Sequence, residues 1–413
     1  MAVLLMLILN LLELSIPLLV FTFASENSLV RPALLPLLGY LTLYTLPLNR
    51  SSFPNKVISN LLDMNTCGLF LQYLDFGLLS RWTFAARGPT SPLGGQRNAK
   101  LSLADRKALE PRGLKPSSLW TRLQWGLFAA TAWRAPATLW EVKGTPPFKT
   151  REPPSRLRFI FDNVITLVLC YLVLDAMSLG EHNPEENAVN FAWEKVRIFT
   201  RLGAVSTKEI KLRITVVLMC WVSAYCALQA SYSLGAIIAV ATHMTTVKVW
   251  PPLFGSLTES WSVRQHWGSF WHQAVRQKIS APAYYATYSL LGLRKGGMAA
   301  RYTNILLTFI VSGLLHRVAE EYADAVPWSQ SGTMRFYCIQ AFGILLEDAF
   351  QGIFHTLTTH QHSRWTRAVG YIWVTFWIVW VSPALFYPRL ELSKKETILP
   401  FSVVGPLMKY LTA

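Results

Sequence analysis

Apolar runs long enough to cross a lipid bilayer recur along the whole chain. A helix needs about 20 predominantly apolar residues to cross a hydrocarbon core of about 30 Å. Such runs lie at residues 2–23, 30–48, 61–79, 157–179, 214–241, 302–321, 336–357 and 368–387, and a shorter one lies at 398–411. The run at 61–79 carries Asp63 and Asp75, so it is compatible with a span or with a re-entrant segment. The pattern predicts an all-α, polytopic membrane bundle of about eight transmembrane helices.

A long polar region separates the early apolar runs from the later ones. Residues 81–158 hold fifteen Lys or Arg against four Asp or Glu, a bias typical of a cytosolic loop. Within it, residues 119–140 carry four tryptophans together with Arg122 and Arg134. This mixture favours an interfacial or partly buried helix with aromatic anchors. Binding to the lipid surface and binding of a polyanionic ligand both remain open for this segment.

Composition agrees with the apolar pattern. The chain is 52% hydrophobic and 15% charged, whereas soluble domains are about 25% charged. The formal net charge of +16 resides in loops between the apolar runs, where the positive-inside bias and anionic lipid explain it better than nucleic acid does. The five cysteines are scattered without metal-ligand spacing, so neither a disulfide framework nor a metal site is expected.

The run at 302–321 contains one histidine, His316. An ionisable side chain inside a bilayer is costly and normally faces a protein interior or a cavity, which makes His316 a candidate for function. On a helix, Phe309, Ser312 and Glu320 share its face. The alternative is a histidine at the water interface that hydrogen-bonds a neighbouring carbonyl.

The segment at 250–273 is rich in aromatic residues. Trp267, Phe270, Trp271 and Ala274 have i, i+3, i+4 and i+7 spacing, which predicts one aromatic face of a helix. Such a face usually serves packing. His272 falls on a different face, and Arg276 lies one turn further along.

Polar residues also enter the run at 336–357. On a helix, Asp348 and Gln351 form a stripe, and Glu347 shares a face with Gln351, so these side chains are expected to point into the protein. They could orient a catalytic imidazole or a substrate hydroxyl, or they could pair with a buried arginine. Arg294, Lys295 and Arg301 form a basic patch immediately before the run that holds His316.

Four stretches of the sequence carry a resemblance. The segment WPPLFGSLTESWSVRQHWGSFWHQ, followed by FIVSGLLHRV, resembles the paired signature of the wax synthase-like branch of the membrane-bound O-acyltransferases. WRAPATLWEVKGTPP at 133–147 and ILLEDAFQGIF at 344–354 resemble segments of fungal members that acylate terpenoid hydroxyls. One departure is Arg317, because plant wax synthases tend to place an acidic residue there. Glu320 and Glu321 are spaced to pair with it on a helix.

The resemblance implies an acyl-CoA-dependent O-acyltransferase with an MBOAT-like fold. It would transfer acetyl from acetyl-CoA to the hydroxyl of a hydrophobic terpenoid or meroterpenoid alcohol in fungal secondary metabolism, without a metal, in the endoplasmic reticulum membrane. With the apolar pattern and the charge bias, this predicts N-terminal transmembrane helices at 1–80, a basic cytosolic or interfacial region at 81–158 and a catalytic transmembrane core at 159–413. The catalytic residues would be His316 and His272. Substrate contacts are expected from Trp267, Trp271, Ser312, Glu347, Asp348 and Gln351, and contacts to the CoA from Arg264, Arg276, Arg294, Lys295 and Arg301.

The residue types also fit acyl transfer independently of the resemblance. Acyl transfer to an alcohol needs a base for the hydroxyl proton, and a buried neutral imidazole suits that task. The sequence has no G-x-S-x-G nucleophile motif, which favours direct attack by the alcohol over an acyl-enzyme. His272, with Arg264 or Arg276 nearby, would orient the thioester or stabilise its oxyanion.

Other classes of protein remain as alternatives. A long-chain wax ester synthase would use the same histidines. A transporter would use the buried His, Glu and Asp as a proton relay, without consuming CoA. A prenyltransferase would need two Asp-rich Mg²⁺ motifs, which the lone Glu347–Asp348 pair does not supply. A membrane scaffold would leave the polar stripes unexplained.

Overall fold

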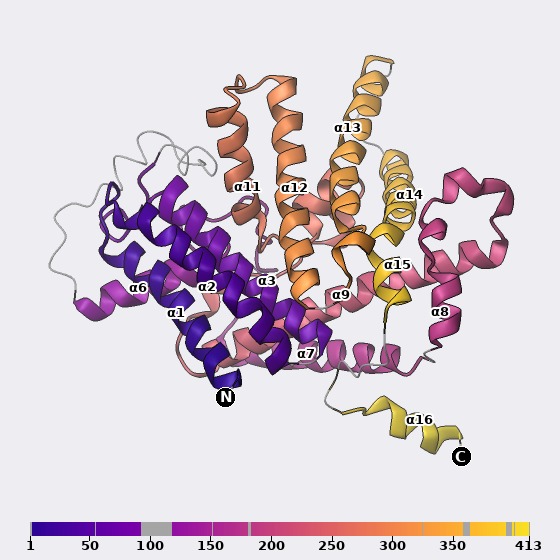
Figure 1. Ribbon diagram of the computed structural model, residues 1–413, viewed down its shortest axis with the longest axis horizontal. Helices are drawn as coiled ribbons and strands as arrows, with labels where there is room; N and C mark the ends of the chain where they lie inside the picture. Colours follow the sequence, from indigo (N-terminus) through magenta and orange to yellow (C-terminus); the bar gives the residue numbers. More distant parts are fainter. Residues whose placement is uncertain are drawn as a thin grey trace. The chain divides into compact units, whose positions relative to one another are not determined.

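A computed structural model describes residues 2–53, 55–91, 118–150, 152–180, 183–323, 325–357, 364–393, 399 and 401–412. Helices dominate these residues (Figure 1), and the strands found among them are β1 (Trp82–Thr83) and β2 (Gly88–Pro89), which form one antiparallel pair. The predicted all-α membrane bundle is therefore confirmed. Residues 92–117 of the basic region lie outside the described residues. The chain divides into two compact units, and each unit combines segments that are distant in sequence.

The first unit comprises Met1–Thr145 and His272–Asp324. Its helices are α1 (Ala2–Phe23), α2 (Val30–Ser52), α3 (Lys56–Tyr73), η1 (Leu74–Leu79), α6 (Leu119–Thr131), α11 (Arg276–Tyr285), η7 (Ala286–Leu290) and α12 (Met298–Tyr322). Helix α12 packs against α11, α3 and α2, so the late helices join the early ones in one bundle. One part of the core is aromatic: Phe21, Tyr73 and Phe76 are buried, and the rings of Phe76 and Trp82 stack 4.0 Å apart.

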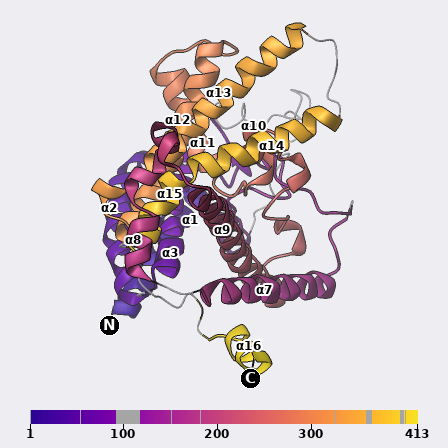
Figure 2. The same cartoon turned by 90° about the vertical axis from the view of Figure 1, so that its right-hand side faces the viewer.

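The second unit comprises Pro146–Trp271 and Ala325–Ala413. Its α-helices are α7 (Arg156–Ser178), α8 (Pro184–Asn190), α9 (Thr207–Ala241), α10 (Val263–Gln265), α13 (Thr333–Leu357), α14 (Arg364–Val381), α15 (Pro383–Glu391) and α16 (Val404–Thr412). Its other helical turns are η2 (Trp193–Val196), η3 (Ile198–Ala204), η4 (Val247–Val249), η5 (Leu257–Glu259), η6 (His266–Phe270) and η8 (Trp328–Gln330). Helices α7 and α9 pack against each other, as Figure 2 shows, and α16 contacts α7.

Five helical segments of the described chain are long and apolar enough to cross a membrane. They are α1, α7, α9, α12 and the continuous stretch Arg364–Glu391, which contains α14 and α15. The predicted runs at 30–48 and 336–357 are helical, as α2 and α13, but neither helix is among these five segments. The run at 61–79 is a helix that changes into the π-helical turn η1. The count of about eight spans therefore stays a prediction.

The helix expected to carry an aromatic face through Ala274 is not continuous, so that prediction is wrong. Helix α10 passes into the π-turn η6, and the backbone becomes extended at Trp271 (φ −65°, ψ 141°). The Trp271 N–H donates to the carbonyl of His266 at 2.7 Å, which closes the π-turn. Ala274 and His272 therefore follow the end of the helix. The rings of Trp267 and Trp271 still pack together, with centroids 6.3 Å apart.

Candidate functional site

His316 lies on α12 and its side chain is half-buried. Its Nδ1 donates a hydrogen bond of 2.7 Å to the carbonyl oxygen of Ser312, one turn earlier. A carbonyl oxygen can only accept, so this bond places the proton of the neutral ring on Nδ1 and the lone pair on Nε2. The alternative of a histidine at the water interface also predicts a hydrogen bond to a neighbouring carbonyl. That bond is present.

His272 lies in the same unit, between the end of η6 and the start of α11. Burial among protein atoms lowers the pKa of His272 to about 3, and the nearby His316 and Arg134 act in the same direction. The ring therefore stays neutral at physiological pH. Because His316 is among the charges that act on His272, the two candidate catalytic residues lie in one neighbourhood of the first unit.

An apolar cluster connects the segments that carry these histidines. Val275 and Leu315 are buried in the same cluster, and Trp133 packs against it. Val275 follows His272 by three residues, and Leu315 directly precedes His316. The cluster thereby ties the α11 segment, α12 and the segment after α6 together.

A buried lysine lies next to this cluster, and no sequence pattern singled it out. The Nζ atom of Lys278 is 3.3 Å from the ring centroid of Trp133 and makes no hydrogen bond to any described residue. Burial holds the pKa of Lys278 well below its usual value, and Asp75 opposes that shift. Asp75 accepts hydrogen bonds from Ser80 (2.5 Å) and Gln277 (2.7 Å). Cation–π contact of this kind stabilises a cation that has left water.

Arg317, the residue that departs from the plant pattern, is buried on α12 with 1% of its surface exposed. Its Nη1 lies 3.3 Å from Oε2 of Glu320, and its Nη2 pairs with Glu321. The pairing expected from the i+3 and i+4 spacing is therefore confirmed. Because the positive charge is neutralised within the helix, it does not add an uncompensated charge beside His316.

The predicted phosphate-binding cations of the first unit lie in two places. The half-buried Arg276 at the start of α11 donates to Oε1 of Gln273 at 2.9 Å. The exposed Arg294, Lys295 and Arg301 flank the start of α12. With a rise of 1.5 Å per residue, Arg301 lies about 22 Å along the helix axis from His316. The patch and the histidine thus occupy opposite ends of one helix.

The predicted acidic residues of α13 belong to the second unit and hold its aromatic segment in place. Glu347 accepts hydrogen bonds from the backbone N–H groups of Val263 (2.6 Å) and Arg264 (3.2 Å) and from Nε1 of Trp373 (2.8 Å). Asp348 pairs with Nη2 of Arg264 at 2.5 Å. The half-buried Gln351 lies one turn further along α13. These contacts favour the alternative in which Glu347 and Asp348 pair with other protein groups and do not orient a substrate or a catalytic imidazole.

The tryptophans predicted to contact substrate also have partners within the second unit. Nε1 of Trp267 donates to Oε1 of Gln340 at 3.1 Å, and Trp271 packs edge-on against Trp221 at 4.7 Å between ring centroids. Beside them lies His266, which the sequence patterns did not single out. Its Nδ1 is 2.8 Å from the hydroxyl oxygen of Ser260, and burial lowers its pKa to about 4.

Changing Glu347 to Gln tests whether this side chain holds the fold together or takes part in the reaction. The substitution removes the negative charge that accepts two backbone N–H groups, so we expect a lower melting temperature and a lower yield of folded protein. Turnover per folded molecule should stay within about twofold of the wild type. The matched control is Glu186→Gln, the same chemical change at an exposed position on α8. A stable Glu347→Gln protein with a turnover more than tenfold lower would instead assign Glu347 to the reaction.

Together, the fold and the histidine pair define a class of protein. A polytopic helical membrane protein with one histidine fixed in a proton-accepting tautomer and a second, neutral histidine close by has the parts of a membrane acyl-transfer enzyme. The chain belongs to the membrane bound O-acyl transferase family, whose model matches residues 250–339. The matched range includes His272 and His316.

The relatives agree on acyl transfer. The chain is 52% identical to the acetyltransferase aurG of Calcarisporium arbuscula, over 95% of this chain and 94% of that protein. It is 36% identical to the acetyltransferase fsoF of Humicola fuscoatra, over 85% and 88% of the two chains. It is 29% identical to the acetyltransferase ataH of Aspergillus terreus, over 69% and 95%. No solved structure matches the chain. The protein is therefore a membrane-bound O-acyltransferase.

Proposed function

We propose that this enzyme transfers the acetyl group of acetyl-CoA to a hydroxyl of a terpenoid or meroterpenoid in fungal secondary metabolism, with His316 as the general base. The observation that carries the proposal is the bond from Nδ1 of His316 to the Ser312 carbonyl, which leaves Nε2 as the basic nitrogen. The names of the relatives, all acetyltransferases, support the acetyl group.

The reaction proceeds by direct attack. The acceptor oxygen adds to the thioester carbonyl as Nε2 of His316 takes the hydroxyl proton, and the C–S bond then breaks. The imidazolium returns its proton to the departing CoA thiolate. A general base in this position typically contributes ~10²–10⁴-fold to the rate. The neutral ring of His272 has one N–H, which can donate to the oxyanion that forms on the carbonyl.

The two substrates differ in polarity, which assigns them different routes. The apolar acceptor partitions into the bilayer, whereas the CoA approaches from the cytosolic side. Arg276 and the patch of Arg294, Lys295 and Arg301 supply positive charge for the CoA phosphates. Arg264 is a weaker candidate because Asp348 already neutralises it. We place the enzyme in the endoplasmic reticulum membrane.

A comparison of donors and acceptors tests this assignment. The purified full chain in detergent is supplied with acetyl-CoA or palmitoyl-CoA, each with a terpenoid alcohol or hexadecanol. Released thiol and the ester products are then measured. We expect the pair of acetyl-CoA and terpenoid alcohol to react at least tenfold faster than any other pair. Preferential formation of the long-chain wax ester would leave the family and the reaction class standing and overturn the proposed substrates.

A further inference from the structure

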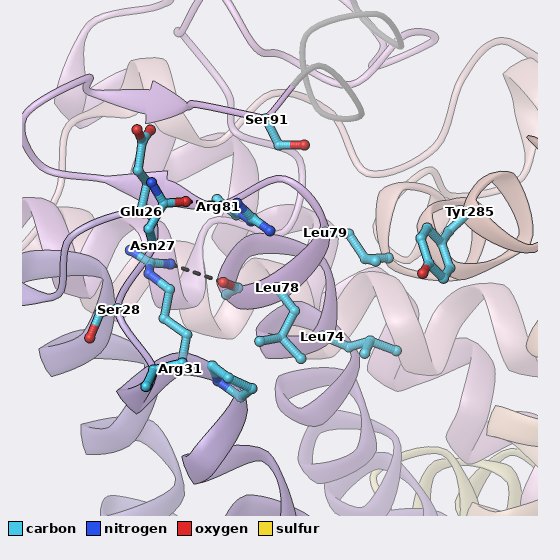
Figure 3. Close-up of a pocket in the computed structure, with 13 residues that line it drawn as sticks. Glu26, Asn27, Ser28, Arg31, Leu74, Leu78, Leu79, Arg81, Ser91 and Tyr285 are labelled. Carbon is cyan, nitrogen blue, oxygen red and sulfur yellow. Dashed lines mark hydrogen bonds between the residues drawn. The ribbon is translucent and has the colours of Figure 1, made fainter. Parts of the chain in front are cut away.

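A cavity of about 550 Å³ opens in the first unit beside the turn between α1 and α2. Its walls come from that turn, from the N-terminal end of α2 and from the π-turn η1, with Tyr285 of α11 on the far side (Figure 3). None of its lining residues belongs to the histidine site described above. Polar side chains gather on one side of the cavity and leucines on the other.

Arg31 supplies a buried positive charge to the polar side. Only 2% of its surface is exposed, and its guanidinium donates four hydrogen bonds to the backbone carbonyls of Ala24, Ser25, Gly77 and Trp82 at 2.8–3.0 Å. Among the described residues, no carboxylate forms an ion pair with it. A buried guanidinium that is solvated by carbonyls alone keeps its full charge, and in a low dielectric that charge attracts an anion strongly.

Arg81 supplies a second guanidinium, this one exposed. Its backbone is in the left-handed region (φ 51°), which is uncommon for a side chain of this size. Two bonds from Thr90, from its backbone N–H and from its hydroxyl, hold the Arg81 carbonyl in that conformation. The side chain reaches the cavity and donates to Oδ1 of Asn27 at 3.0 Å, without an ion pair to any described carboxylate. The lining therefore holds two guanidinium groups and one carboxylate, Glu26.

The position of the cavity relative to the bilayer identifies the kind of anion. The spanning helix α1 ends at Phe23 and α2 begins at Val30, so the cavity lies where a span emerges from the hydrocarbon core. Leu29, which also lines it, is 82% exposed, and Leu74, Leu78 and Leu79 lie on its apolar side. A ligand bound here would have its charge among the arginines and an apolar portion along the leucines.

We propose that this cavity binds the headgroup of an anionic glycerophospholipid, with the phosphate between Arg31 and Arg81 and the acyl chains directed along the leucine side toward the bilayer. Arg81 is suited to this task because its exposed, planar guanidinium can donate two hydrogen bonds to one phosphate. Arg31, four of whose five N–H groups already donate to carbonyls, contributes mainly its positive charge. Anionic lipids are enriched at the cytosolic leaflet, the side predicted for the basic region that begins at Arg81.

Native mass spectrometry of the full chain in detergent tests the site without any acyl-transfer substrate, so its result is independent of the proposed function. Dioleoylphosphatidylglycerol and dioleoylphosphatidylcholine are titrated into the wild type and two variants. The first variant, Arg81→Gln, removes an exposed guanidinium from the cavity. The matched control, Arg87→Gln, makes the same change in the same hairpin, at the same φ of 51°, but away from the cavity.

We expect the wild type to bind phosphatidylglycerol about tenfold more tightly than phosphatidylcholine, because both lipids carry a phosphate but the choline cation of the second cancels its charge. Arg81→Gln should abolish that preference, and Arg87→Gln should retain it. Equal affinities for the two lipids in the wild type, or equal losses in the two variants, would overturn the proposal. Displacement of the bound lipid by CoA, with a raised KM for acetyl-CoA in Arg81→Gln, would overturn it too, because the cavity would then serve the donor.

Discussion

Replacing His316 by alanine should lower acetyl transfer by at least ~100-fold, because the transition state loses its proton acceptor. Replacing it by asparagine separates the base from the structural bond. The amide Nδ2–H of asparagine occupies the place of Nδ1–H, so it can still donate to the Ser312 carbonyl, but asparagine has no basic nitrogen in the place of Nε2. We expect His316→Asn to fold as the wild type does and to be as inactive as His316→Ala.

The measurement is the initial rate of thiol release from acetyl-CoA per folded molecule, with the folded fraction determined by gel filtration in detergent. A His316→Asn protein that keeps more than about a tenth of the wild-type rate would show that the bond to Ser312, rather than proton transfer, is what His316 contributes. Loss of folding in His316→Ala alone, with full activity in His316→Asn, would also show that His316 contributes the bond to Ser312 and not proton transfer.

Removing either member of the buried ion pair on α12 should destabilise the protein by about 3–5 kcal/mol, the usual effect of breaking a buried pair by removing one partner. Both Arg317 and Glu320 have about 1% of their surface exposed, and 3.3 Å separates their charged atoms. Arg317→Met takes the guanidinium away from the buried Glu320 carboxylate. Glu320→Met leaves Arg317 its pair with Glu321, whose side chain is 44% exposed, so its effect should be the smaller of the two.

The double variant Arg317→Met/Glu320→Met tests whether the loss comes from the charge that remains after a single substitution. Because it leaves neither of the two charges buried, we expect it to recover most of the melting temperature that each single variant loses. Turnover per folded molecule should be preserved in the double variant, since the two side chains pair with each other within α12 and are about 1% exposed. Additive losses in the double variant would show that each side chain contributes separately through packing.

Several features of this protein follow from the sequence because they depend on neighbours within one helix. The apolar runs predict helices because the bilayer thickness sets their length. The bond between His316 and the Ser312 carbonyl, and the pairs of Arg317 with Glu320 and Glu321, join residues three or four apart, the spacing that places side chains on one helical face. The spacing of residues within one helix was therefore sufficient to predict which side chains and carbonyls lie next to His316 and Arg317.

Other features depend on contacts between residues far apart in sequence, and only the tertiary structure decided them. Periodicity could not show that the backbone leaves the helix at Trp271, because a π-turn adds one residue without changing the residue types. Nor could it show that Lys278 packs against Trp133, which lies far earlier in the chain, or that His272 lies near His316. The sequence indicated which residues are candidates for the chemistry. The packing of α11 and α12 against α3 and the segment after α6 determined which of these residues lie close together. The burial that sets their charge exists only once those helices are assembled.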